Sequence, residues 1–110
     1  MRCLIQRQKC VTMRQPVHGA DMPEDYETAF TICQRNQELA RGDGGAGGPY
    51  AVTLNIGCPT GYTPTGIWHS HPNGTVTPSD GDYNQMRRLR LRHMCISVPQ
   101  TGETQCYEVK

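Results

Sequence analysis

A strict two-residue alternation of side chains runs through the middle of the chain. Its apolar or aromatic positions are Tyr50, Val52, Leu54 and Ile56. Successive side chains of a strand point to opposite faces, so this period predicts a strand over 50–56 with one buried face. The chain has 110 residues, which is enough for one modest core. We therefore expect a single domain over 1–110 that is rich in strands.

Other segments extend this pattern on both sides. β-rich composition and turn residues predict further strands over 27–33, 38–42, 66–71, 94–98 and 105–109. Only 79–94 has apolar residues at helical spacing, with Tyr83 and Met86 three positions apart. We expect an α/β (α+β) fold, in which helices flank a mainly antiparallel mixed β-sheet.

Two segments carry no clear period. Residues 1–22 form a poorly defined N-terminal segment, and Pro16, Gly19 and Pro23 interrupt any long helix there. Residues 42–49 (GDGGAGGP) predict a flexible glycine-rich loop. This loop spells G-x-G-x-x-G, but Pro49 and an extended segment follow it instead of the helix that a dinucleotide site requires. Dinucleotide binding is therefore rejected.

Charge and hydropathy exclude several classes of partner. Eleven Lys and Arg stand against ten Asp and Glu, so the chain as a whole has no strong field for nucleic acid or anionic membranes. No stretch approaches the roughly 20 apolar residues that span a bilayer, and the N-terminus has no signal-like apolar run. We expect a soluble, cytoplasmic protein.

Six cysteines are spread through the chain, at positions 3, 10, 33, 58, 95 and 106. None forms a C-x-x-C pair, and without an export signal free buried thiols are favoured. A hairpin turn between Gln100 and Thr101 would place Cys95 opposite Cys106. A disulfide between those two, or a second metal site that includes Cys33 and Cys58, is the alternative.

The residues that suggest a metal site lie in a polar segment from His69 to Asp82, which runs from the predicted strand at 66–71 into the predicted helix. His69 and His71 are two apart on a strand, so both imidazoles project from one face and can bind one metal ion. A catalytic zinc site takes three protein ligands and keeps one position for water. Asp82 at the start of the helix is the natural third ligand.

Together with Pro72 and Ser79, these residues match H-x-H-P-x(7)-S-x-x-D, and the string resembles the JAMM (MPN-plus) zinc metalloprotease motif. The resemblance implies one zinc per chain held by His69, His71 and Asp82, and an oxyanion contact from Ser79. It also implies a glutamate general base on an earlier strand.

Glu27 opens the predicted strand 27–33 and is our choice for this base, with Glu24 and Glu38 as alternatives. The implied activity is hydrolysis of peptide or isopeptide bonds. The implied substrates are ubiquitin-like or sulfur-carrier proteins.

Simpler interpretations stand beside this one. Ser79 and Asp82 also spell a capping box, which would satisfy the first N–H groups of a helix without any catalysis. We expect zinc ligation to keep Asp82 from reaching back to the cap. The chain could be a non-catalytic MPN scaffold. Its arginines, Arg87, Arg88, Arg90 and Arg92, could bind nucleic acid, although a solvated helix face explains them.

Overall fold

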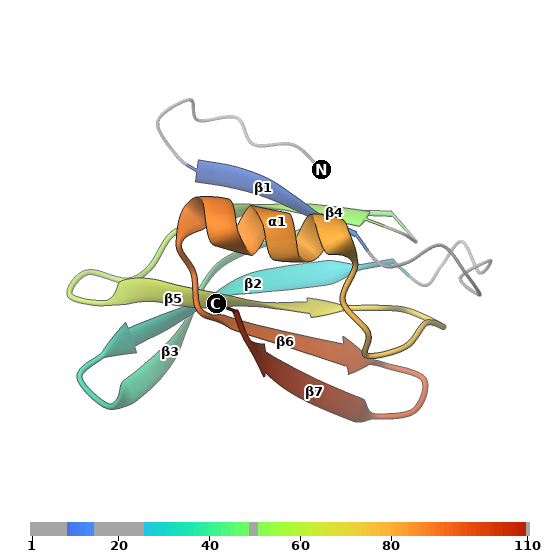
Figure 1. Ribbon diagram of the computed structural model, residues 1–110. Coiled ribbons are helices and arrows are strands. Elements are labelled where there is room, and N and C mark those ends of the chain that lie inside the picture. The colour runs from blue at the N-terminus through green and yellow to red at the C-terminus, as the bar shows by residue number, and fades with distance from the viewer. Residues whose placement is uncertain (1–8, 15–25, 49–50, 110) are drawn as a thin grey trace.

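The computed structural model describes residues 9–14, 26–48 and 51–109. Within these ranges the chain forms seven strands and one helix (Figure 1). They are β1 (Lys9–Arg14), β2 (Thr28–Arg35), β3 (Glu38–Ala46), β4 (Ala51–Ile56), β5 (Thr63–Ser70), α1 (Asp80–Leu89), β6 (His93–Val98) and β7 (Glu103–Glu108).

Five of the strands form one sheet in the order β3-β2-β5-β6-β7. Every pair is antiparallel except β5 and β6, which run parallel. A parallel pair needs a crossover, and α1 supplies it. This confirms the predicted α+β fold with a mainly antiparallel mixed sheet, although the described residues contain one helix where several were expected.

The two remaining strands, β1 and β4, pair with each other in a separate antiparallel ribbon. In Figure 1 this ribbon and α1 lie on the same side of the five-stranded sheet. Their inward side chains meet in one core, which includes Met13 from β1, Leu54 from β4, Ile67 from β5, Met86 from α1 and Ile96 from β6. Burial of these side chains joins the ribbon, the helix and the sheet.

The helix is shorter than the predicted 79–94. Arg90 adopts a left-handed conformation (φ 59°, ψ 36°), and its N–H donates to the carbonyls of Arg87 and Met86. Such a residue ends a helix, because the next N–H groups no longer follow the helical path. Residues 93 and 94 consequently belong to β6. No helix of the described residues is long and apolar enough to cross a membrane.

The glycine-rich loop predicted over 42–49 is wrong for most of its length, since β3 continues through Ala46. Glycine is required here because other backbone comes very close. A Cβ on Gly42 would collide with the Gly57 carbonyl, and one on Gly44 with the Ala29 carbonyl. Gly42 and Gly44 therefore lie where neighbouring backbone leaves no room for a side chain.

The prediction for residues 1–22 also needs correction. β1 lies inside this segment and pairs with β4 from Lys9↔Ile56 to Arg14↔Ala51, with Met13 fully buried. The interruption predicted at Pro16, Gly19 and Pro23 lies outside the described residues. A strand of six residues is too short to show a clear period when its partner is forty residues away in the sequence.

The four cysteines whose side chains the structure describes are paired, so the free thiols expected at these positions are wrong. Cys33 bonds to Cys58 and Cys95 to Cys106, and the described residues contain no free cysteine. The β6–β7 register places Cys95 opposite Cys106, which confirms the predicted hairpin. These pairs also rule out the alternative of a second metal site. Cys3 and the side chain of Cys10 lie outside the described part of the chain.

The close approach at Gly42 can be tested by substitution. We expect Gly42→Ala to lower the free energy of unfolding by about 1–3 kcal/mol, because the added methyl group overpacks the contact with Gly57. Gly48→Ala is the matched control, since a Cβ there meets no atom within 4 Å. Urea unfolding of the two variants measures both values, and equal losses would contradict the close approach.

Candidate metal centre

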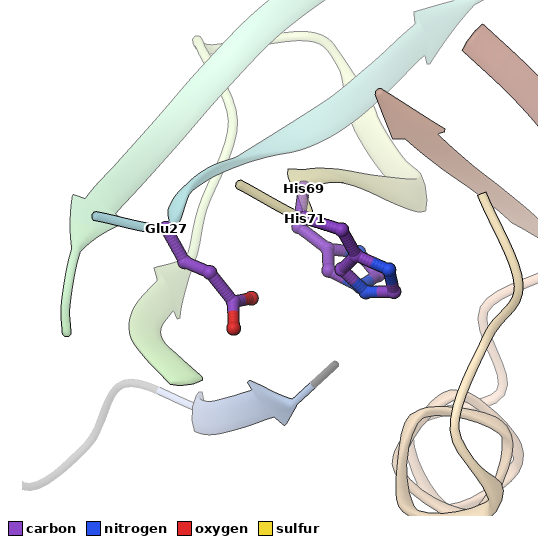
Figure 2. A group of neighbouring side chains, drawn as sticks. All are labelled: Glu27, His69 and His71. Carbon is purple, nitrogen blue, oxygen red and sulfur yellow. The ribbon is translucent and has the colours of Figure 1, made fainter. Parts of the chain in front are cut away.

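The central strand β5 positions the two histidines. His69 lies between Ala29 on β2 and Ile96 on β6, so neighbouring strands hold its backbone on both sides. His71 follows the end of β5, and its N–H donates to the Ser97 carbonyl at 2.8 Å. Both imidazoles are fully buried on the core side of the sheet, with their Nε2 atoms 3.1 Å apart (Figure 2).

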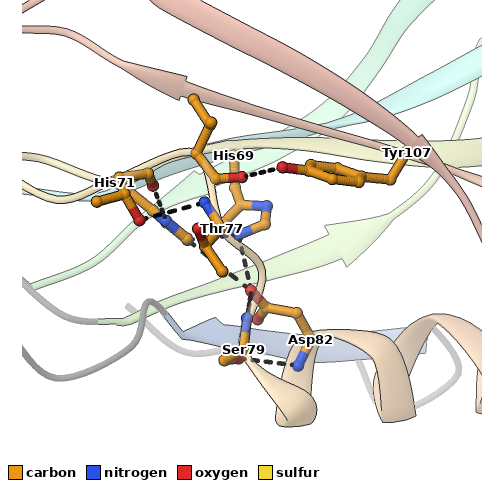
Figure 3. Close-up of polar contacts among 8 residues, drawn as sticks. His69, His71, Thr77, Ser79, Asp82 and Tyr107 are labelled. Atoms are coloured by element: carbon orange, nitrogen blue, oxygen red, sulfur yellow. Dashed lines mark hydrogen bonds and ion pairs between the residues drawn. The ribbon is translucent and has the colours of Figure 1, made fainter.

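Asp82 reaches the same point from the first turn of α1. Its Oδ2 lies 3.1 Å from Nε2 of His69 and 3.8 Å from Nε2 of His71 (Figure 3). The same oxygen accepts the Ser79 N–H at 3.3 Å, while Ser79 Oγ accepts the Asp82 N–H at 3.0 Å. The Asp82 carboxylate therefore completes the predicted capping box and also lies beside both imidazoles.

Glu27 approaches the imidazoles from the start of β2 (Figure 2). Its N–H donates to the Gly48 carbonyl at 2.8 Å, and its own carbonyl accepts the Gly47 N–H at 2.9 Å. One ligand atom from each of Glu27, His69 and His71 lies within 4.8 Å of the others, and all three residues are buried. The structure therefore brings the predicted Glu27 to the histidines.

The alternative glutamates do not share this position in the described structure. Glu38 is the exposed first residue of β3, where Arg35 donates to its Oε1 at 2.8 Å and Tyr62 also donates to it. These two hydrogen bonds, that from Tyr62 first, lower the pKa of the Glu38 carboxyl. Glu24 lies outside the described residues.

Hydrogen bonding and burial favour imidazoles that can bind a metal ion. The Thr75 carbonyl lies 2.7 Å from Nδ1 of His71, so that nitrogen carries the proton and Nε2 keeps its lone pair. Burial lowers the pKa of His69, against the opposing hydrogen bond and charge of Asp82. Metal binding requires a neutral imidazole, and the burial of His69 favours that form.

The ligand atoms also have the spacing that zinc requires. A tetrahedral Zn²⁺ with bonds of about 2.0–2.1 Å separates its ligand atoms by about 3.3 Å. The three separations among His69, His71 and Asp82 are 3.1, 3.1 and 3.8 Å. Two carboxylates and two imidazoles in one buried volume form a donor set that a divalent cation would neutralise. The residues fit such an ion.

The sequence analysis missed three residues that hold this centre. Ser70 Oγ accepts the Thr28 N–H at 2.9 Å and ties the Glu27 end of β2 to β5. The Thr75 carbonyl orients His71, and the Tyr107 hydroxyl donates to the next carbonyl, that of Val76, at 2.6 Å. No local spacing marks these contacts, because each joins side chain to backbone and two of them join distant segments.

Comparison with known proteins identifies the family of the chain. Neither curated proteins nor solved structures gave a match. The family model described as prokaryotic homologs of the JAB domain matches residues 8–110, a range that contains all five predicted site residues. The match confirms the resemblance seen in the H-x-H-P string. The chain therefore belongs to the family of prokaryotic homologs of the JAB domain.

Proposed function

We propose that the chain is a zinc-dependent hydrolase of peptide or isopeptide bonds. His69, His71 and Asp82 hold one zinc ion, and Glu27 is the general base. The observation that carries this proposal is the position of Glu27, whose buried carboxylate lies beside the two imidazoles. A purely structural metal site is complete with its ligands, whereas hydrolysis needs a further group beside them that can accept a proton.

The residues divide the chemistry between them. Bound zinc supplies an acidified water and a polarised scissile carbonyl. The Glu27 carboxylate accepts the proton of the attacking water and then delivers it to the leaving amine. Ser79 Oγ already accepts the Asp82 N–H, so its own proton is available to donate to the oxyanion.

We propose a protein substrate, with a ubiquitin-like modifier or a sulfur-carrier protein as the class suggested by the family. The four side chains Glu27, His69, His71 and Asp82 have no exposed surface in this structure. These four side chains are therefore shielded from bulk water. Burial also strengthens every electrostatic contact at the centre, because water no longer screens it.

The other hypotheses have less support. A non-catalytic scaffold does not require the complete ligand set or the buried Glu27 that this chain retains. Nucleic-acid binding would depend on Arg87, Arg88, Arg90 and Arg92, all of which are exposed as a solvated surface requires. No further feature of these arginines favours nucleic acid.

Metal content is the first test. Protein purified without added metal is expected to contain about one zinc per chain. A double variant with His69→Ala and His71→Ala should lose it, while Glu27→Gln should keep it, because Glu27 is assigned to the proton transfer. Elemental analysis of the three proteins measures this, and zinc-free wild-type protein would exclude the hydrolase.

Activity tests the role of Glu27. Cleavage is measured on a ubiquitin-like protein joined to a lysine side chain by an isopeptide bond, and on a linear fusion of the same protein. Glu27→Gln should slow the turnover by about 10²–10⁴-fold with zinc retained, because the general base is lost. Glu38→Gln removes an exposed carboxylate at the start of β3 and should cleave like the wild type. Equal rates in both variants would reject Glu27 as the base.

The two proposed roles of Ser79, helix cap and oxyanion donor, can be measured separately. Ser79→Ala should lower the free energy of unfolding by about 1 kcal/mol through loss of the helix cap, whereas Ser79→Gly should cost only a few tenths. Both variants lack the hydroxyl, so both should slow cleavage by roughly 10²–10³-fold. Urea unfolding and turnover are measured together. Wild-type turnover in Ser79→Gly would limit Ser79 to the cap.

A further inference from the structure

The segment 71–79 joins β5 to α1 and carries His71, and we call it the ligand loop. Hydrogen bonds within the loop stabilise its conformation. The Gly74 N–H donates to the His71 carbonyl at 3.0 Å, and the Thr77 N–H donates to Thr75 Oγ1 at 3.3 Å. His71 Nδ1 donates to the Thr75 carbonyl at 2.7 Å. The orientation of that carbonyl thus decides which nitrogen of His71 faces the ligand site.

The hairpin β6–β7 holds the ligand loop from outside. The Tyr107 hydroxyl on β7 donates to the Val76 carbonyl at 2.6 Å (Figure 3). On the turn of the same hairpin, Gln100 Oε1 accepts the Asn73 N–H at 2.7 Å. Thr75, with its carbonyl, lies between these two anchored positions. The loop therefore depends on a hairpin that contributes none of the proposed ligands.

Tyr107 is suited to this contact. The other residues of β7 are exposed, whereas Tyr107 is half-buried and packs with Val76 against the core. Burial, followed by the charges of Tyr83 and Glu103, raises the pKa of the Tyr107 phenol. The hydroxyl therefore remains a donor at neutral pH. A peptide plane fixed at Val76 restricts the adjoining plane that carries the Thr75 carbonyl, because the two planes share one Cα.

We propose that Tyr107 is a positioning residue for the metal centre. By holding the Val76 carbonyl it keeps the Thr75 carbonyl on Nδ1 of His71, so that Nε2 faces the ligand site. Gln100 supports the same geometry from the other end of the loop. The inference rests on the proposed zinc site, and such outer contacts fix the ring orientation and the tautomer of a ligating histidine.

The decisive variant is Tyr107→Phe, which removes one hydroxyl and keeps the ring. Competition with a chromophoric chelator should show zinc bound about tenfold more weakly, the effect typical of losing an outer contact. Tyr62→Phe is the matched control, because its hydroxyl also donates a hydrogen bond, to the exposed Glu38 at the start of β3. The control should change the zinc affinity by less than about twofold.

A second readout does not depend on zinc. In metal-free wild-type protein, ¹⁵N shifts of His71 should report the tautomer protonated at Nδ1, and Tyr107→Phe should shift the population toward the other tautomer. If the wild type bound no zinc, the proposed function would fail while this readout still tested Tyr107. Unchanged zinc affinity together with unchanged His71 shifts would overturn the proposal.

Gln100→Ala guards against a Tyr107 variant that does not fold. Gln100 lies on an exposed turn, and its loss frees the Asn73 end of the ligand loop. We expect about threefold weaker zinc binding, in line with one lost hydrogen bond, and a smaller shift of the His71 tautomer. Wild-type behaviour in this variant would contradict the claim that the hairpin positions the loop.

Discussion

Two carboxylates and two imidazoles share one fully buried volume, and the surrounding strands, loop and helix are arranged around it. Removing such groups from water is costly unless each finds a partner, and a divalent cation bound there would offset the charge of the two carboxylates. The strands, the ligand loop and the helix cap together hold atoms from four separate positions in the chain close to one point.

The topology explains how distant residues reach that point. β5 ends at the centre with His69 and His71, and the antiparallel neighbour β2 begins there with Glu27. The parallel partner β6 requires a crossover, and α1 starts this crossover beside the end of β5, where Asp82 lies. One end of the sheet thereby collects Glu27 and all three proposed ligands.

The sequence predicted what depends on local spacing. The H-x-H-P string and Asp82 identified the candidate ligands. The family resemblance, together with the start of the predicted strand 27–33, identified Glu27, which the structure brings to the histidines. Prediction from the sequence failed where contact with a distant segment determines the local conformation. β1 depends on β4, the glycine strand depends on the backbone of Gly57, and the hydroxyl of Tyr107 depends on a loop about thirty residues earlier in the chain.

The glycines at positions 42, 44 and 47 have a consequence for how related sequences would be compared. A side chain at Gly42, Gly44 or Gly47 would strike the backbone of a neighbouring segment. Selection for folding alone would therefore keep these positions as constant as the metal ligands. Because they also spell a nucleotide-binding pattern, their invariance would suggest a phosphate site to anyone reading an alignment. In this chain, the invariance of these glycines would reflect only the close approach of two backbone segments.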